Sequence, residues 1–171
     1  MGINLDSVIS HQQTAYLKNR QKTDNLNLMQ HIIEKSNDQN LSAMIVSLDT
    51  EKAFDSIEHW YIKEVLHKIG LTDFCKTFDL LYRGQEVKIL LNQHIAGSYN
   101  IKNGVKQGDA LTCILFILGI EPLIKNIEND NTVVGVSIGN TKVPKIISYA
   151  DDVACLIKPT QNNLDAIFLK L

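Results

Sequence analysis

Three aspartates stand at positions where carboxylates could bind metal ions. Asp49 ends an apolar run over residues 43–49 that has the length and composition of a buried strand, and Asp151 and Asp152 lie between two further apolar runs. Carboxylates at the edge of an apolar sheet are costly unless cations neutralise them. Mg²⁺ prefers such hard oxygen ligands, and two ions about 3.5 to 4 Å apart can assist phosphoryl transfer. The sequence therefore admits two-metal phosphoryl chemistry.

Each candidate also has a purely structural interpretation. Aspartates at strand ends and in hairpin turns commonly serve as turn or capping residues. Asp55, followed by Glu58, matches an Asp variant of the capping box, so it is expected to cap a helix rather than bind a metal. Gly104 and Gly108 would permit a turn before a helix, and Arg20 would lie on a solvated basic face. A generic α+β domain is therefore one alternative.

The elements that must position these side chains follow from hydrophobic spacing. Helices are predicted at about 25–36, 57–69, 72–82, 109–126 and from residue 161 onward, with Gly70 as the C-terminal cap of the second. Strands are predicted at about 43–49, 86–92, 95–101, 133–138, 142–149 and 153–157. Ala150, Asp151 and Asp152 would then occupy a tight turn. This order predicts an α+β fold, a small antiparallel sheet with helices packed on one face.

Length and composition set the limits of the interpretation. The 171 residues suit one domain, and the 44% hydrophobic content with a net charge of -2 excludes disorder. The longest apolar stretch, residues 114–120, is far shorter than the roughly 20 residues that cross a bilayer, so no membrane partner is expected. Near-neutrality offers no general reason to expect nucleic acid. It conceals a local basic excess of Lys18, Arg20 and Lys22.

Cysteine usage and the N-terminal residues indicate an intracellular protein. Cys75, Cys113 and Cys155 are widely spaced, cannot all pair and form no zinc-binding pattern, which is typical of reduced thiols. The first residues have neither the basic segment nor the apolar segment of a secretory signal. We therefore expect the protein to be located in the cytoplasm or the nucleus.

Three short motifs follow one another along the chain. Residues 49–55 are DTEKAFD, residues 105–112 are VKQGDALT and residues 149–152 are YADD. In this order and spacing they resemble the palm motifs of reverse transcriptases, most closely those of non-LTR retrotransposons. Upstream, residues 13–25 are similar to the family's segment from Gln-x-x-Phe to Gly-Arg. The resemblance covers about residues 10–160 and implies a polymerase palm with partial fingers at the N-terminus.

The resemblance implies a reaction and a set of metal ligands. Asp49 and Asp151 would hold two Mg²⁺ ions, for which Mn²⁺ could substitute, with Asp152 beside them. The implied activity is RNA-directed DNA polymerisation, in which a primer 3′-hydroxyl attacks the α-phosphate of a nucleotide and pyrophosphate leaves. The implied partners are an RNA template, a DNA or RNA primer and deoxynucleoside triphosphates.

The resemblance also implies substrate contacts. Phe54 would lie against the nucleotide sugar, where a ring leaves no room for a 2′-hydroxyl and selects deoxynucleotides. Gln107 and Gly108 would let the backbone approach nucleotide and template, and Arg20 would contact the triphosphate. Tyr149 is likewise expected at the substrate. Viral RNA-dependent RNA polymerases, a further alternative, place an Asp at the position of Phe54 and Gly-Asp-Asp in the third motif, so Phe54 and the pair Tyr149-Ala150 favour DNA synthesis.

The resemblance implies three segments in the chain and leaves two alternatives for its activity. Residues 1–42 would be a partial fingers segment, 43–160 the palm, and 161–171 the start of a truncated helix. The family's thumb and endonuclease are then expected elsewhere on the same longer polyprotein. The alternative is a catalytically incomplete fragment that acts as a nucleic-acid or protein binding module.

Overall fold

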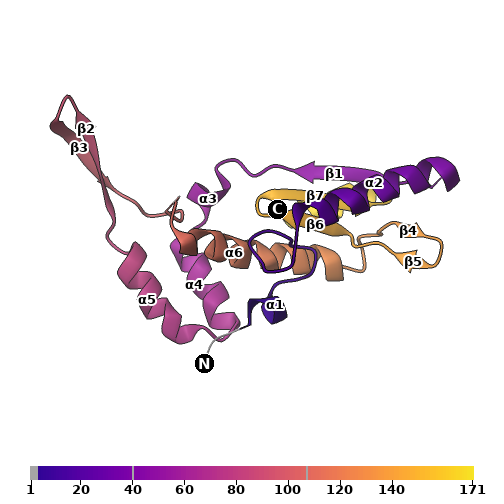
Figure 1. The fold of residues 1–171 in the computed structure, drawn as a ribbon, viewed down its shortest axis with the longest axis horizontal. Coiled ribbons are helices and arrows are strands. Elements are labelled where there is room, and N and C mark those ends of the chain that lie inside the picture. Colours follow the sequence, from indigo (N-terminus) through magenta and orange to yellow (C-terminus); the bar gives the residue numbers. More distant parts are fainter. Residues whose placement is uncertain (1–3, 40, 107) are drawn as a thin grey trace. The chain divides into compact units, whose positions relative to one another are not determined.

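The computed structural model describes residues 4–39, 41–106 and 108–171, which form two compact units (Figure 1). One unit comprises residues 51–119, and the other combines residues 2–50 with 120–171. The length predicts one unit. The structure has two, because residues 51–119 contain two helices and a hairpin whose contacts are mainly with one another. The boundary after Gly119 falls inside the longest helix, α6 (Ala110–Asn129).

A three-stranded antiparallel sheet lies at the centre of the second unit. Its strands are β1 (Met44–Leu48), β6 (Ile146–Tyr149) and β7 (Asp152–Ile157), in the order β1-β7-β6. Leu48 pairs with Val153, and Tyr149 pairs with Asp152 across a two-residue turn. The α+β class, the small antiparallel sheet and the turn at Ala150 and Asp151 are therefore confirmed.

Helices cover both faces of this sheet, so the prediction that they pack on one face is wrong. On one face, β7 contributes Val153, Cys155 and Ile157 to a core shared with α6 and with α7 (Gln161–Phe168). On the other face, Leu156 joins a core with Ile32 of α2 (Lys22–Gln39). The cause is that β6 and β7 are apolar on both sides, which is typical of strands buried between two layers. The prediction of a buried strand at 43–49 is wrong as to burial, because the residues of β1 are half-buried or exposed.

The buried Cys155 gives this core a chemical test. Burial raises the pKa of the Cys155 thiol to about 11, so under about 1% of it is thiolate at pH 8.5. Iodoacetamide at that pH is therefore expected to leave Cys155 unmodified in the folded chain and to alkylate it once urea is added, as read by peptide mass spectrometry. The partly exposed Cys113 is the internal comparison. Equal labelling of Cys155 in both conditions would contradict the packing.

The unit of residues 51–119 departs from the prediction at its first helix. Its elements are α3 (Ala53–Ser56), α4 (His59–Lys68), α5 (Thr72–Tyr82), β2 (Glu86–Leu91) and β3 (His94–Asn100). Asp55 is not the cap of α4, because it lies inside α3 and the extended Ile57 separates the two helices. Glu58 takes the N-cap position of α4 without a side-chain capping bond. Gly70 is confirmed as a C-terminal cap, with φ +84 and its N–H bonded to the carbonyl of His67.

One predicted hairpin is confirmed and the other is partly wrong. Strands β2 and β3 pair through a turn at Asn92 and Gln93, both with positive φ, as a type I′ hairpin requires. In the second hairpin only β4 (Ser137–Ile138) and β5 (Thr141–Lys142) pair. The predicted strand 142–149 is interrupted at Pro144, which lacks an N–H for the ladder, and its remainder pairs with β7.

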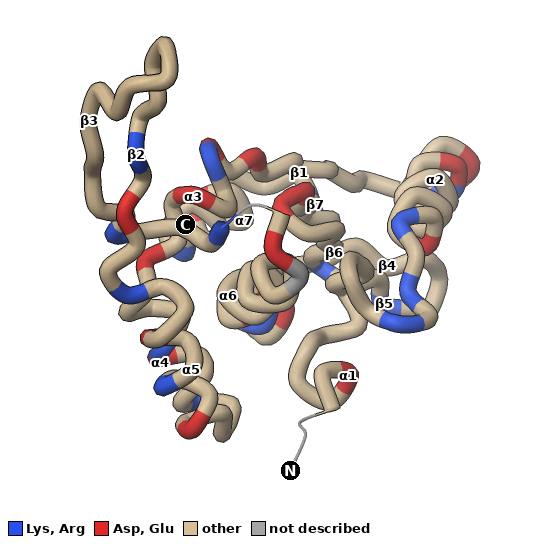
Figure 2. Tube along the Cα trace, turned by 60° about the vertical axis from the view of Figure 1, so that its left-hand side comes forward, with Lys and Arg blue, Asp and Glu red and all other residues tan. Residues whose placement is uncertain are grey.

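Helices α2 and α6 are longer than hydrophobic spacing predicted, whereas α7 ends at Phe168 instead of continuing to Leu171 as predicted. α2 begins three residues earlier and ends three later than the predicted 25–36, because its polar ends carry no apolar repeat. A short helix, α1 (Leu5–Val8), precedes it. None of the helices in the described part of the chain is both long and apolar enough to cross a membrane. Acidic and basic residues alternate along α4 and α5 (Figure 2), in keeping with the small net charge.

Candidate active site

The structure brings the three aspartates to one end of the central sheet. Asp49 directly follows β1, Asp151 lies in the turn between β6 and β7, and Asp152 opens β7. Because Leu48 is paired with Val153, Asp49 and Asp152, the residues next to this pair, lie at the same end of the sheet. Asp49 and Asp152 are exposed and Asp151 is half-buried. Three carboxylates on or beside neighbouring strands therefore lie at one solvent-facing end of the sheet, which we call the acidic edge.

This edge fits an open magnesium site rather than a closed cage. Among the described residues, no three acidic, histidine or cysteine side chains converge closely enough to enclose an ion. Mg²⁺ does not require such a cage, since it commonly binds through one or two carboxylates and completes its octahedron with water and substrate phosphates. The oxygen donors present are of the type that it prefers.

Lys22 supplies a positive charge at the same edge. Its Nζ lies 3.3 Å from Oδ2 of Asp152 and 5.1 Å from the ring centroid of Tyr149. The side chain of Lys22 is 53% exposed, so its ammonium remains accessible to other anions. Lys22 is not among the site residues that the sequence predicts. The only signal was the local basic excess, in which Lys22 was one of three cations.

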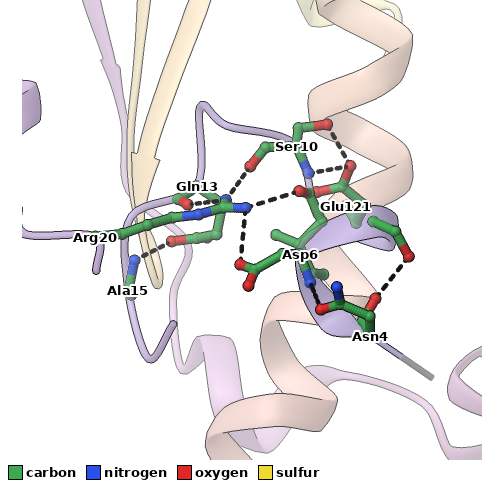
Figure 3. A network of polar contacts seen from close by, with 9 residues as sticks. Asn4, Asp6, Ser10, Gln13, Ala15, Arg20 and Glu121 are labelled. Atoms are coloured by element: carbon green, nitrogen blue, oxygen red, sulfur yellow. Dashed lines mark hydrogen bonds and ion pairs between the residues drawn. The ribbon is translucent and has the colours of Figure 1, made fainter. Parts of the chain in front are cut away.

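Arg20 is engaged by the backbone instead of facing solvent. Its guanidinium donates hydrogen bonds to the carbonyls of Ser10 at 2.5 Å, Gln13 at 2.8 Å and Ile9 at 3.2 Å. It also pairs with Asp6 at 3.3 Å (Figure 3), and its side chain is only 10% exposed. The guanidinium thus holds the segment of residues 9–15, which we call the N-terminal strap.

The N-terminal strap connects α6 to the edge of β6. At one end, buried Glu121 of α6 accepts hydrogen bonds from the N–H and the hydroxyl of Ser10 (Figure 3). At the other end, the N–H of Thr14 donates to the Ser148 carbonyl at 2.9 Å, and the N–H of Ser148 donates to the Gln12 carbonyl at 2.8 Å. The strap therefore runs beside the strand that leads into the aspartate turn.

Phe54 belongs to the other unit and is held there by ring and backbone contacts. Its ring stacks on Phe116 with centroids 4.2 Å apart, and its carbonyl accepts the N–H of Val105 at 2.8 Å. The N–H of Gly104 donates to the carbonyl of Ile57, also at 2.8 Å. These bonds fasten the loop that precedes α6 to the short helix α3. They restrict where the half-buried Phe54 ring can lie.

Gly108, a further predicted substrate contact, lies on that same loop. Gly108 is exposed and has φ +89, a left-handed conformation that favours glycine. No atom lies within 4 Å of the position that its Cβ would take, so the backbone there is open to an approaching molecule. Gln107 lies outside the residues that the structure describes. Their roles toward nucleotide and template stay predictions.

The small antiparallel sheet with acidic residues at one end is a polymerase palm-like fold. The family model described as "Reverse transcriptase (RNA-dependent DNA polymerase)" matches residues 3–170. The chain therefore belongs to the reverse transcriptase family, as its motifs predicted.

Curated relatives come from retroelements. The chain is 26% identical over 133 residues to a "Retrovirus-related Pol polyprotein from type-1 retrotransposable element R2" of Popillia japonica, which covers 77% of the chain and 22% of the relative. It is 27% identical over 159 residues to the type-2 element R2DM polyprotein of Drosophila melanogaster, covering 92% and 15%. It is 28% identical over 151 residues to the "Transposon TX1 uncharacterized 149 kDa protein" of Xenopus laevis, covering 87% and 11%. The chain thus spans between about a tenth and a quarter of these relatives.

Proposed function

We propose that this chain is the core of an RNA-directed DNA polymerase of a retroelement, which adds deoxynucleotides to a primer 3′-hydroxyl. The observation that carries the proposal is the shared edge of Asp49, Asp151 and Asp152 in a chain of the reverse transcriptase family. The proposed partners are an RNA template, a DNA or RNA primer and deoxynucleoside triphosphates. Residues 1–42 are assigned to the fingers and 43–160 to the palm.

Asp49 and Asp151 are the proposed ligands of two Mg²⁺ ions, with Asp152 beside them. Reverse transcriptases as a family generally use divalent metals. When bound, such ions activate the attacking hydroxyl and stabilise the leaving oxygen of phosphoryl transfer. The chain's own contribution is to hold three oxygen donors at the solvent-facing end of the sheet, next to the buried strands β6 and β7, where substrate can reach them.

Lys22, rather than Arg20, is the proposed contact to the triphosphate. Arg20 already donates to three carbonyls and pairs with Asp6, so it has little capacity left for a ligand. Lys22 is exposed, and its ammonium stands beside Asp152 and Tyr149. A lysine ammonium is a point charge that binds phosphate without a fixed geometry. Arg20 would act at a distance by holding the N-terminal strap.

Primer extension on an RNA template tests this function. With Mg²⁺ and separate deoxynucleotide and ribonucleotide mixtures, the chain is expected to extend the primer with deoxynucleotides. Preferential extension with ribonucleotides would instead support an RNA-dependent RNA polymerase. Binding of the primer–template without extension, measured by fluorescence anisotropy in the same buffer, would support the binding-module alternative.

Replacement of Phe54 by Ala is expected to weaken discrimination against ribonucleotides by about tenfold to a hundredfold. The ring is proposed to exclude the 2′-hydroxyl, and steric exclusion of one small group commonly provides selectivity of that order. The measurement is the ratio of kcat/KM for a deoxynucleotide and its ribonucleotide. Phe74→Ala is the matched control, because it removes a half-buried ring from α5 in the same unit. An unchanged ratio in Phe54→Ala would remove the sugar-contact role.

A further inference from the structure

The turn that carries Asp151 has an unfavourable backbone conformation. Its first residue, Ala150, has φ +55, in the left-handed region that residues with a Cβ seldom adopt. Ala150 is also buried, so water cannot satisfy its peptide groups. Something in the surrounding structure must therefore hold this peptide in place.

The side chain of Gln13 in the N-terminal strap makes the contacts that hold it. Its Oε1 accepts the N–H of Ala150 at 3.0 Å and the N–H of Ala15 at 2.9 Å. Its Nε2 donates to Oγ of Ser148 at 2.8 Å and to the carbonyl of Ala150 at 3.4 Å. Gln13 is 0% exposed, so its amide has no water as an alternative partner. One side chain thus binds both backbone polar groups of the strained residue.

The contacts of the strap make Gln13 itself rigid. Arg20 donates to the Gln13 carbonyl at 2.8 Å (Figure 3). The strap backbone is also bonded to Ser148 on both sides of Gln13. The hydroxyl of Ser148 adds a bond to the Ala150 carbonyl at 3.0 Å. A buried polar cluster with these bonds satisfied favours a single arrangement.

We propose that Gln13 is a positioning residue that fixes Ala150 in its left-handed conformation and thereby orients the carboxylates of Asp151 and Asp152 toward divalent metal ions. The inference rests on the proposed metal role of these aspartates. It differs from a general packing role because it predicts a change in the turn and in metal affinity, in addition to any change in stability. The amide of glutamine suits the task because it both donates and accepts.

The first experiment measures the turn without reference to metal. Gln13→Met keeps the side-chain volume and removes all four hydrogen bonds. In this variant, amide hydrogen exchange by NMR is expected to be at least about tenfold faster at Ala150. The matched control is Gln12→Ala, since Gln12 contributes its backbone carbonyl, which the substitution retains. Unchanged exchange at Ala150 in a folded Gln13→Met chain would overturn the proposal.

The second experiment measures Mn²⁺ binding by electron paramagnetic resonance. Gln13→Met is expected to weaken binding about tenfold, and adding Ala150→Gly is expected to restore part of the loss, because glycine adopts positive φ without support. Asp151→Asn separates two failures. If Asp151→Asn leaves Mn²⁺ binding unchanged, the proposed function fails together with the inference. If Asp151→Asn abolishes binding but Gln13→Met does not change it, only the inference fails.

A milder variant keeps the test decisive if Gln13→Met does not fold. Ser148→Ala removes one hydroxyl from the same cluster and retains the Gln13 bond to the Ala150 N–H. A smaller loss of Mn²⁺ affinity and of Ala150 exchange protection is expected, again relieved by Ala150→Gly. Unchanged affinity and protection in Ser148→Ala would overturn the proposal.

Discussion

Replacement of Asp151 by Asn is expected to lower the rate of deoxynucleotide incorporation about a hundredfold to a thousandfold while leaving the fold intact. Loss of one preorganised electrostatic group commonly has an effect of this size on a chemical step. Asn is nearly isosteric with Asp and equally suited to turns, so the backbone between β6 and β7 should be retained. The measurement is single-nucleotide incorporation on a primer–template, with thermal unfolding followed by circular dichroism.

The matched control for this substitution is Asp38→Asn. Asp38 is an exposed carboxylate near the opposite end of α2 from Lys22, about 24 Å along a helix that rises about 1.5 Å per residue. It changes the net charge by the same amount and should leave incorporation unchanged. Equal losses in Asp38→Asn and Asp151→Asn would indicate a general charge effect and would contradict the assigned role.

Replacement of Gly104 by Ala is expected to destabilise the unit of residues 51–119 by about 3 kcal/mol, from backbone strain and steric overlap together. Gly104 has φ +87, and a Cβ there would lie 2.8 Å from Cα and from the carbonyl oxygen of Asp55. These are backbone atoms of α3, so no side-chain rotation relieves the overlap. The bond between the N–H of Val105 and the Phe54 carbonyl should be lost as well.

Gly108→Ala separates the two causes in a chemically identical substitution. Gly108 has φ +89, but its Cβ would meet no atom within 4 Å. This variant should therefore show only the cost of the left-handed backbone, about 1 kcal/mol. Urea unfolding monitored by circular dichroism measures both values. Similar losses in Gly104→Ala and Gly108→Ala would show that the approach to Asp55 is unimportant.

The predictable part of the fold is the part encoded by local patterns. The runs at 43–49 and 153–157 are apolar and bounded by polar residues, so their strands and the acidic turn follow from sequence alone. The position of α2 on the opposite face of the sheet from α6 cannot be predicted from the sequence. An apolar stripe on a helix indicates that this side of the helix is buried. When the strands are apolar on both sides, the sequence does not indicate which face of the sheet the helix covers.

The candidate site was predictable to a similar extent. The aspartates stand out because they interrupt apolar runs. Arg20 and Gln13 lie in a polar segment where side chains normally face solvent, and their burial depends on Glu121 and Ser148, more than 100 residues away. Hydrophobic periodicity does not predict contacts between residues so far apart in the sequence. The role of Lys22 could not be predicted for the same reason, because its proximity to Asp152 depends on where α2 packs.

The N-terminal strap also has a consequence for self-association. In the strand order β1-β7-β6, β6 is an edge strand, and its outward N–H and carbonyl groups at Ser148 are bonded to Gln12 and Thr14 of the strap. Exposed strand edges recruit strands of other chains. By occupying these groups, the strap closes that stretch of the sheet against edge-to-edge pairing. The apolar β6 can therefore lie beside the acidic turn without becoming a template for aggregation.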